Sequence, residues 1–311
     1  MKIRVTPEQM TFEDAFRRFI LHKRAIGCAE GTLETYVWDF RKFCHYIDPR
    51  TSCSGLQTRQ IQDCMNRIAD EGLARNTIRH YSATLSSFLS WARDEGLTSA
   101  RCQLYRGEET VPATYSEADL KKLLRKPDMK TCDFPEFRNW VIVSLLINNG
   151  IRAATVRAIQ NRDLHLDEGV IYLRHTKRKK ALTIPLCPSL VASLAEYVSI
   201  RKGQPDEPLF VNENGTPMTE SGLQSAIQRY NRSRGVSLGS LHAFRHTFAR
   251  MYLVDCKGDA LMLQKLLGHE TLDMTRHYVK LFDADIVEDF KTHSPLEKLQ
   301  KSQKIILMSS K

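Results

Sequence analysis

The sequence lacks long hydrophobic runs, internal repeats and low-complexity tracts. Its longest apolar stretch runs from Val141 to Ile147 and is interrupted by Ser144, whereas a membrane-spanning helix needs about 20 apolar residues. The N-terminus from Met1 to Glu8 contains no apolar signal core. These absences predict a soluble, cytoplasmic protein with no membrane partner.

Paired cysteines are also missing. The eight cysteines are scattered and form no C-x-x-C pair, which excludes a zinc ribbon and a secreted disulfide framework. We expect reduced, mostly buried thiols in a cytosolic protein. The eight are Cys28, Cys44, Cys53, Cys64, Cys102, Cys132, Cys187 and Cys256.

What the sequence does have is positive charge. The 311 residues carry a formal net charge of +10 at a pI of about 9.2, which fits a nucleic-acid partner because Lys and Arg neutralise phosphates. Solubility explains the same charge in many proteins. The first 100 residues hold 14 Lys and Arg against 12 Asp and Glu, so most of the excess lies further along the chain.

The N-terminal third predicts a compact bundle of four helices. Apolar side chains recur there at helical spacing, Thr11 is a suitable N-cap, and Gly27, Gly72 and Gly96 each follow a helical stretch as helix-ending glycines do. The stretches are Phe12–Ile20, Leu33–Phe43, Thr58–Glu71 and Asn76–Arg93.

A linker is predicted at residues 106–115, where the sequence RGEETVPATY loses its hydrophobic periodicity. It separates a helical domain at 1–105 from a second domain at 116–295. Residues 296–311 form a basic tail with an apolar run at 305–308, and this tail is a candidate to dock on a neighbouring protomer.

The second domain is also predicted to be mainly helical. We expect a helix from Ser116 and an apolar helix over Pro135–Asn149, then two strands over Val170–Leu173 and Ala181–Leu186, closed by Pro188. The fold class is therefore mainly α with a small antiparallel β-sheet. The remaining expected helices are Val191–Arg201, Thr219–Arg232, Ala243–Val254, Ala260–Leu267 and Asp273–Val279.

Two basic residues stand where the chain turns. Arg152 follows Gly150 at the end of the apolar helix, where an arginine at a helix junction can reach into a cleft. Lys177 lies in the basic turn between the two strands, and such a turn can place an ammonium in a DNA groove. Taken alone, a surface arginine and a solvated turn explain both, and spacing does not separate Lys177 from Lys179 or Lys180.

His242 and Arg245 share one helix face because they are three residues apart, so both can address one phosphate. His242 and His246 are four apart, as in a zinc-protease helix, but Ala243 stands where that motif needs glutamate. We therefore expect no metal ion and no other cofactor.

His269 follows a helix-ending Gly268, and Tyr278 lies in a polar stretch nine residues later. Considered alone, each has a purely structural explanation: a histidine at a helix end and a tyrosine half-buried on a helix. A tyrosine with a pKa near 10 is a poor nucleophile at neutral pH, and nearby cations such as Arg152 and Arg245 would lower that pKa.

Taken together, the six residues suit a metal-free attack of a tyrosine on a phosphodiester. Two guanidiniums can clamp the non-bridging oxygens in bidentate fashion, which lysine does less well. A tyrosine nucleophile gives a covalent intermediate that keeps the bond energy of the broken backbone. The set points to DNA strand exchange.

These motifs resemble those of the tyrosine recombinases, the phage integrase family. The resemblance spans about residues 116–290, and the N-terminal helices resemble the SAM-like core-binding domain of that family less specifically. The motifs are Gly150-Ile-Arg152, Lys177 ahead of Ile184-Pro-Leu186, His242-x-x-Arg245-His-Thr-Phe-Ala249, Leu266-Leu-Gly-His269 and Tyr278.

The resemblance implies a mechanism. Tyr278 would attack the scissile phosphate and leave a 3′-phosphotyrosyl bond and a free 5′-hydroxyl. Lys177 would protonate the 5′ leaving oxygen as general acid, and His242 would act in proton transfer with Tyr278.

The same resemblance assigns the phosphate contacts. Arg152 and Arg245 would hold the non-bridging oxygens, and His269 would donate a hydrogen bond to the phosphate. Family members commonly carry an acidic residue three positions after the first arginine, where this chain has Thr155. Some other group must orient Arg152 here.

The implied partners are double-stranded DNA and further copies of the chain. Four protomers on two duplexes would form the synapse, and accessory DNA-bending or excision factors would act in some pathways. The compact two-domain layout is similar to that of chromosome-dimer resolvases (Xer-like recombinases) and simpler mobile-element integrases. The implied function is integration or excision of a mobile element, or resolution of DNA.

Two alternatives remain open from the sequence. A type IB topoisomerase uses a similar set of Arg, Lys, His and Tyr, and site-specific rather than general cleavage would distinguish the two enzymes. A non-catalytic DNA-binding accessory factor would have a decayed site, and formation of a covalent adduct would exclude it.

Overall fold

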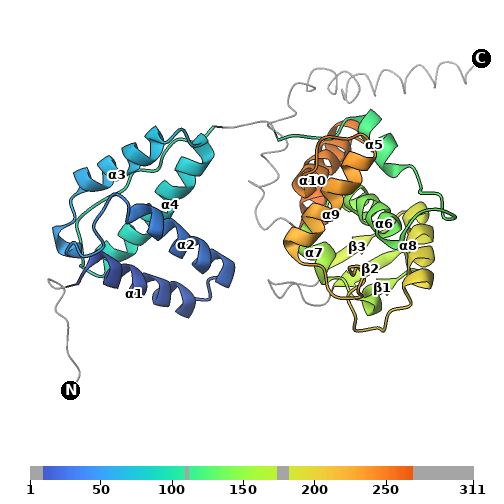
Figure 1. The fold of residues 1–311 in the computed structure, drawn as a ribbon, viewed down its shortest axis with the longest axis horizontal. Coiled ribbons are helices and arrows are strands. Elements are labelled where there is room, and N and C mark those ends of the chain that lie inside the picture. The colour runs from blue at the N-terminus through green and yellow to red at the C-terminus, as the bar shows by residue number, and fades with distance from the viewer. Residues whose placement is uncertain (1–9, 109–111, 174–181, 269–311) are drawn as a thin grey trace, which may run out of the picture. The chain divides into compact units, whose positions relative to one another are not determined.

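The computed structural model describes residues 10–108, 112–173 and 182–268 (Figure 1). It divides into two compact units, Met1–Thr110 and Val111–Lys311, and the division falls inside the segment predicted as a linker. Lys177, His269, Tyr278, the helix expected at 273–279 and the tail at 296–311 lie outside the described residues.

The described part of the first unit contains four α-helices, as predicted. Thr11 caps the first of them, because its side-chain oxygen accepts a hydrogen bond from the Asp14 N–H at 3.1 Å. Gly27, Gly72 and Gly96 all adopt positive φ angles at helix ends. The helices are α1 Phe12–Ala25, α2 Glu30–Phe43, α3 Thr58–Asp70 and α4 Arg75–Asp94.

Aromatic rings build the core of this unit. The Phe16 and Phe40 rings stack at a centroid distance of 4.2 Å, and Phe88 meets Phe12 and Phe19 edge-on at 5.5 and 5.7 Å. These residues come from α1, α2 and α4. Burial of large rings therefore fixes how the three helices pack.

The second unit is mainly helical with a small antiparallel sheet, which confirms the predicted fold class. Its helices surround α6, which packs against α5, α8, α9 and α10 and buries residues on all its faces, as a central core helix does. The helices are α5 Glu117–Leu124, α6 Phe134–Asn149, α7 Ala153–Ala158, α8 Pro188–Arg201, α9 Glu220–Ser233, α10 Leu241–Arg250 and α11 Ala260–Leu267 (Figure 1).

The sheet has the strand order β1-β2-β3, and both pairings are antiparallel. The strands are β1 Leu164–His165, β2 Val170–Leu173 and β3 Leu182–Pro185. In the β2–β3 pairing Ile171 lies opposite Ile184, and both side chains are buried. The register therefore directs one face of the hairpin into the core.

Four expectations need correction. The structure adds β1 and the six-residue α7, which are both too short to show a period in the sequence and were not predicted. The helix expected over Ala243–Val254 instead ends at Arg250 and continues as a π-helical turn over Met251–Asp255. Pro188, expected to close a strand, is the first residue of α8, where its missing N–H is not needed.

The fourth correction concerns the thiols. All eight cysteines are free, but only Cys53 and Cys64 are buried, and Cys187 and Cys256 are exposed. The prediction of mostly buried thiols is therefore wrong. Residue type alone does not settle burial for a small side chain near an element end, as at Cys187 just before α8. Over the ranges that the structure describes, no helix has the length and apolarity to cross a membrane.

Candidate active site

The second unit brings Arg152, His242 and Arg245 together where α6, α7 and α10 meet. Gly150 ends α6 in the left-handed conformation at φ 59°, and Arg152 is the N-cap residue of α7. A Cβ atom on Gly150 would lie 2.5 Å from Cδ1 of the Phe248 ring on α10. Only glycine therefore suits both the turn and the close approach of α10.

Arg245 is buried, with 3% of its surface exposed. Its Nη1 donates a hydrogen bond to the Gly150 carbonyl at 2.9 Å, and its Nη2 donates one to the Leu267 carbonyl at 3.0 Å. A buried charge needs such partners, because desolvation without them is expensive. The guanidinium thus joins the end of α6 to the end of α11 and is held in a defined plane.

The Leu267 carbonyl belongs to the helix end that the sequence predicted. Gly268 ends α11 in the left-handed conformation at φ 61°, and His269 follows directly in the sequence. Arg245 therefore fixes the main chain two residues before His269 and two residues before Arg152. His269 itself lies outside the described residues.

His242 is exposed at the first turn of α10. The pKa of its imidazole is lowered from the ordinary value of 6.5, first by desolvation and then by the positive charges of Arg245 and Arg152. Its ring meets that of His246 edge-on at a centroid distance of 5.0 Å. The arrangement favours the neutral imidazole, which can accept a proton.

Arg152 lies at the start of α7, and the Thr155 N–H donates to its carbonyl at 2.8 Å in the first turn. Thr155 is thus part of the turn that carries Arg152. The positive charge of Arg152 acts on His242, so α7 and α10 present their cations to one place. This is the convergence that spacing alone could not predict.

Asn149 joins the end of α6 to the sheet, a contact that the sequence does not predict. Its side chain is buried, and its Nδ2 donates to the Pro185 carbonyl at 2.7 Å. Asn148 donates to the same carbonyl at 3.2 Å. These bonds attach the end of α6 to β3, the strand that follows residues 174–181. The sequence feature that could have indicated this contact is the pair of asparagines just before the helix-ending glycine.

Tyr115 anchors the other side of α10. Its ring stacks on Phe244 at 4.2 Å, its N–H donates to the Thr247 hydroxyl at 2.9 Å, and its own hydroxyl donates to the Ser240 carbonyl at 3.1 Å. Asn231 donates to that hydroxyl at 3.0 Å. The helix that carries His242 and Arg245 is therefore held on both faces.

Lys177 and Tyr278 complete the predicted site residues, and both lie outside the described residues. The structure brings together three of the six predicted residues and describes nothing of the other three. Among the residues it does describe, no cluster of three or more His, Cys, Asp or Glu side chains could hold a metal ion.

Family models match most of the chain. The model of the phage integrase family matches residues 115–285, and that of the phage integrase N-terminal SAM-like domain matches residues 14–96. The chain therefore belongs to the phage integrase family, which confirms the family identified from the motifs. The two matches correspond to the two units of the structure.

Relatives that match this chain over nearly their whole length are tyrosine recombinases. XerC of Lactobacillus leichmannii is 28% identical over 300 residues, which cover 92% of this chain and 99% of the relative. XerD of Staphylococcus haemolyticus is 23% identical over 297 residues, which cover 92% of this chain and 99% of the relative. These relatives favour a recombinase over a type IB topoisomerase or an accessory factor.

Solved structures share the fold. A Tn1549 transposon integrase in complex with a circular intermediate DNA has a TM-score of 0.71 at 20% identity, over 86% of this chain and 95% of that one. A lambda integrase tetramer bound to a Holliday junction has a TM-score of 0.69 at 17% identity, over 87% of this chain and 77% of that one.

Proposed function

We propose that this protein cleaves and rejoins DNA at specific sites through a covalent 3′-phosphotyrosyl intermediate on Tyr278. The observation that carries the proposal is the junction of α6, α7, α10 and α11, where Arg245 is bonded to two main-chain carbonyls and shares one electrostatic environment with Arg152 and His242. A fixed guanidinium and a second arginine beside a neutral imidazole suit the charge that develops on a phosphate during attack.

In this mechanism Arg152 and Arg245 bind the non-bridging oxygens of the scissile phosphate, and His269 donates a further hydrogen bond. Arg245 needs no reorganisation during the reaction, because its two carbonyl bonds fix its plane beforehand. Donors fixed in this way stabilise the developing negative charge more than mobile ones.

Proton transfers are divided between two groups. His242, neutral because its pKa is lowered, accepts the proton of the Tyr278 hydroxyl as the phenolic oxygen attacks phosphorus. Lys177 gives a proton to the 5′ oxygen as the bond from phosphorus to that oxygen breaks. Rejoining reverses both transfers when a 5′-hydroxyl attacks the phosphotyrosine. No metal ion or cofactor enters these steps.

The partners follow from the reaction. Strand exchange needs two duplexes, and we propose four protomers for the synapse, the assembly named for the related lambda integrase on a Holliday junction. The 1–105 domain and the 116–295 domain would both bind the duplex, and we propose a cytoplasmic location, where this DNA substrate would be met. Accessory DNA-bending or excision factors would select integration, excision or resolution.

The role of Lys177 can be isolated with a modified leaving group. A duplex selected from a random pool by binding to the protein is prepared with sulfur in place of the 5′ bridging oxygen at the cleaved bond. A thiolate leaves without protonation, so Lys177→Ala should regain most of its lost cleavage on this substrate. Arg152→Ala should not, because its phosphate oxygens are unchanged. If both variants respond alike to sulfur, Lys177 is not the general acid.

Recombination itself is tested on a plasmid with two copies of the selected site. We expect exchange between the two sites and no change on a plasmid without them. Relaxation of supercoils on both plasmids, without exchange, would instead indicate a topoisomerase.

A further inference from the structure

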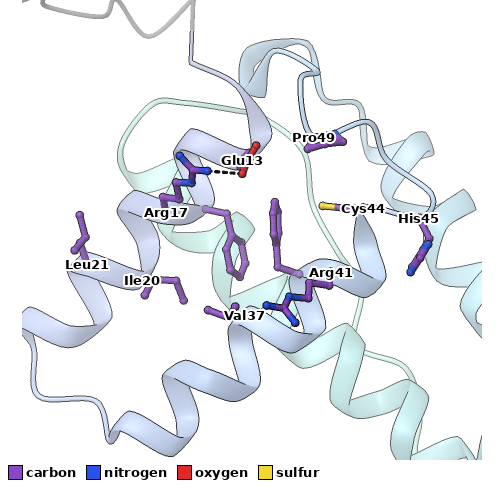
Figure 2. Close-up of a pocket in the computed structure, with 11 residues that line it drawn as sticks. Glu13, Arg17, Ile20, Leu21, Val37, Arg41, Cys44, His45 and Pro49 are labelled. Atoms are coloured by element: carbon purple, nitrogen blue, oxygen red, sulfur yellow. Dashed lines mark hydrogen bonds and ion pairs between the residues drawn. The ribbon is translucent and has the colours of Figure 1, made fainter.

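Two features of the structure lie outside the proposed mechanism. One is an apolar groove of about 690 Å³ between α1 and α2, where Leu21 and Val37 remain exposed (Figure 2). The other is the set of contacts that hold the start of α10, the helix that carries His242 and Arg245. Only the second bears on the chemistry of the site.

His242 and Arg245 are held in different ways, although both belong to α10. Arg245 is fixed by its own hydrogen bonds to the carbonyls of Gly150 and Leu267. His242 is the second residue of the helix and is exposed. The place of its imidazole relative to the two arginines of the site therefore depends on the first turn of α10.

Bonds to other parts of the domain hold that first turn. Within the described residues, the hydroxyl of the N-cap residue Ser240 makes no capping hydrogen bond, although serine is favoured at this position. Gln224 on α9 donates instead to the Gly239 carbonyl at 2.6 Å. The Tyr115 hydroxyl donates at 3.1 Å to the Ser240 carbonyl, which also accepts the Ala243 N–H of the first turn at 3.2 Å. Tyr115 is therefore bonded to the turn itself.

A buried amide aims the hydroxyl of Tyr115 at that carbonyl. Asn231 on α9 is fully buried, and its Nδ2 donates to the Tyr115 oxygen at 3.0 Å and to the Leu238 carbonyl at 2.8 Å. Because the phenolic oxygen accepts this bond, its own hydrogen is left for the Ser240 carbonyl. Burial raises the pKa of Tyr115 well above its usual range, so the hydroxyl remains a donor at neutral pH.

We propose that Tyr115 is a positioning residue for His242, because its hydroxyl holds the start of α10 where the imidazole faces the two arginines of the site. This role rests on the proposed function, in which His242 accepts the proton of Tyr278. Tyr115 is buried and acts through the helix. Loss of its hydroxyl should therefore misplace the imidazole without removing any group that contacts the phosphate.

The titration of His242 reports the position of its ring. Among the described residues, the charged or titratable groups that face the ring are Arg152 on α7 and Arg245 and His246 on α10. Desolvation, and then the positive charges of the two arginines, lower the pKa of His242 from the ordinary value of 6.5. Both effects weaken if the first turn of α10 loosens, so the pKa of His242 should rise back toward 6.5.

Tyr197 on α8 provides a matched control. Like Tyr115 it is buried in the core of the second unit, and its hydroxyl donates to a main-chain carbonyl, that of Leu209, at 3.2 Å. Neither residue of this pair belongs to α10. Tyr115→Phe keeps the ring stacked on Phe244 and the N–H bonded to Thr247, so each Phe variant loses one buried hydroxyl. The two variants should lose comparable stability.

NMR titration of the full-length protein with isotope-labelled histidine measures the pKa of His242 directly, and the His242→Gln variant identifies its resonance. We expect this pKa to rise toward 6.5 in Tyr115→Phe and to stay unchanged in Tyr197→Phe. The same pKa in the wild-type protein and in Tyr115→Phe would overturn the proposal, whether or not the protein cleaves DNA.

Single-turnover cleavage of the selected site connects the position of His242 to the reaction. Tyr115→Phe should lower the maximal rate several-fold more than Tyr197→Phe, and its rate should begin to fall at a higher pH. DNA affinity should be the same in both variants. Equal rates in the two variants would overturn the positioning role. If the wild-type rate does not fall at low pH while NMR gives the expected change, the position of the ring stands and the role of His242 as proton acceptor fails.

Discussion

The two units of this recombinase bury different kinds of side chain. The described part of the first unit buries Phe rings from three helices and few polar groups, namely Asp39, Ser82 and Thr84. The described part of the second unit buries a longer polar set, namely Arg138, Asn139, Asn149, Asp163, Asn231, Arg245 and Thr247.

The polar groups also act differently. In the first unit Asp39 on α2 joins side chains of α4, with Thr84 at 2.5 Å and His80 at 2.9 Å. In the second unit, Arg245 and Asn149 bind main-chain carbonyls at element ends. Apolar packing orders helices, but a loop end has few apolar contacts and needs directional bonds. The buried polar groups therefore lie where the site requires fixed loops.

The largest effect should come from the two arginines of the site. Arg152→Ala and Arg245→Ala should each lower DNA cleavage by about 10²–10³-fold, because each removes a donor to the phosphate. Only Arg245→Ala should also lower the free energy of unfolding, by about 2–4 kcal/mol, because it leaves two carbonyls without their charged donor. Single-turnover cleavage and urea unfolding measure the two quantities. Equal stability of both variants would remove the loop-fixing role of Arg245.

The aromatic core of the first unit gives the next prediction. Phe88→Ala should lower the free energy of unfolding of that unit by about 3–5 kcal/mol, because the ring contacts Phe12, Phe16 and Phe19. Trp38→Ala is the matched control, since 66% of Trp38 is exposed, and it should change stability by less than about 1 kcal/mol. Thermal unfolding followed by circular dichroism compares them. A similar loss in both would mean that ring burial does not hold the bundle.

Gly150 tests, at a single backbone position, how tightly the loop ends of the second unit are fixed. Gly150→Ala should lower stability by about 2–4 kcal/mol, because it combines left-handed strain with a contact at 2.5 Å to Phe248. It should also lower cleavage, since the Gly150 carbonyl holds Arg245.

Gly215→Ala serves as the control for Gly150→Ala. Its φ of +74° is similar, but no atom lies within 4 Å of an added Cβ, so only the strain of about 1–2 kcal/mol remains. Denaturant midpoints of the two variants measure the difference. Equal midpoints would show that the approach of α10 is not tight.

The smallest effect concerns pH. The pKa of His242 is lowered on folding, so between the folded and unfolded values the native state binds fewer protons than the unfolded state. This group's contribution therefore makes stability rise with pH through that window and stay level outside it. His242→Gln should reduce this acid-side loss in unfolding experiments across pH. An identical pH profile in the variant would mean that neither desolvation nor the neighbouring arginines lower the pKa of His242 on folding.

The cleavage rate should follow the same titration of His242. The neutral imidazole accepts the proton of Tyr278, so the wild-type cleavage rate should fall as pH drops through the lowered pKa of His242. In His242→Gln the slower residual rate should lose that pH dependence.

Much of the first unit could be predicted from the sequence. Its four helices match the predicted stretches closely, because Thr11, the glycines at helix ends and regular apolar spacing are all local signals. Elements without local periodicity, such as β1 and α7, were missed. The π-helical turn after Arg250 was missed too, because side-chain spacing reports apolar faces rather than hydrogen-bond pattern.

In the site, too, local features could be predicted from the sequence and long-range contacts could not. Arg152, His242 and Arg245 could be selected from motif order, and the spacing placed His242 and Arg245 on one helix. The burial of Arg245 and its two carbonyl partners could not be predicted, because those partners are 95 and 22 residues away in the sequence. The role of Asn149 likewise depends on Pro185, 36 residues further along.

The identity of the nucleophile is the central claim, and covalent trapping tests it most directly. Purified protein is mixed, without metal or ATP, with a nicked duplex carrying the selected site, and the products are separated on a denaturing gel beside Tyr278→Phe. A nick next to the cleaved bond lets the short 5′-hydroxyl fragment diffuse away, so the intermediate accumulates. The account predicts an adduct of the protein with one DNA strand that is absent in Tyr278→Phe. An adduct that persists in Tyr278→Phe, or none with the wild-type protein on a site that it binds, would contradict it.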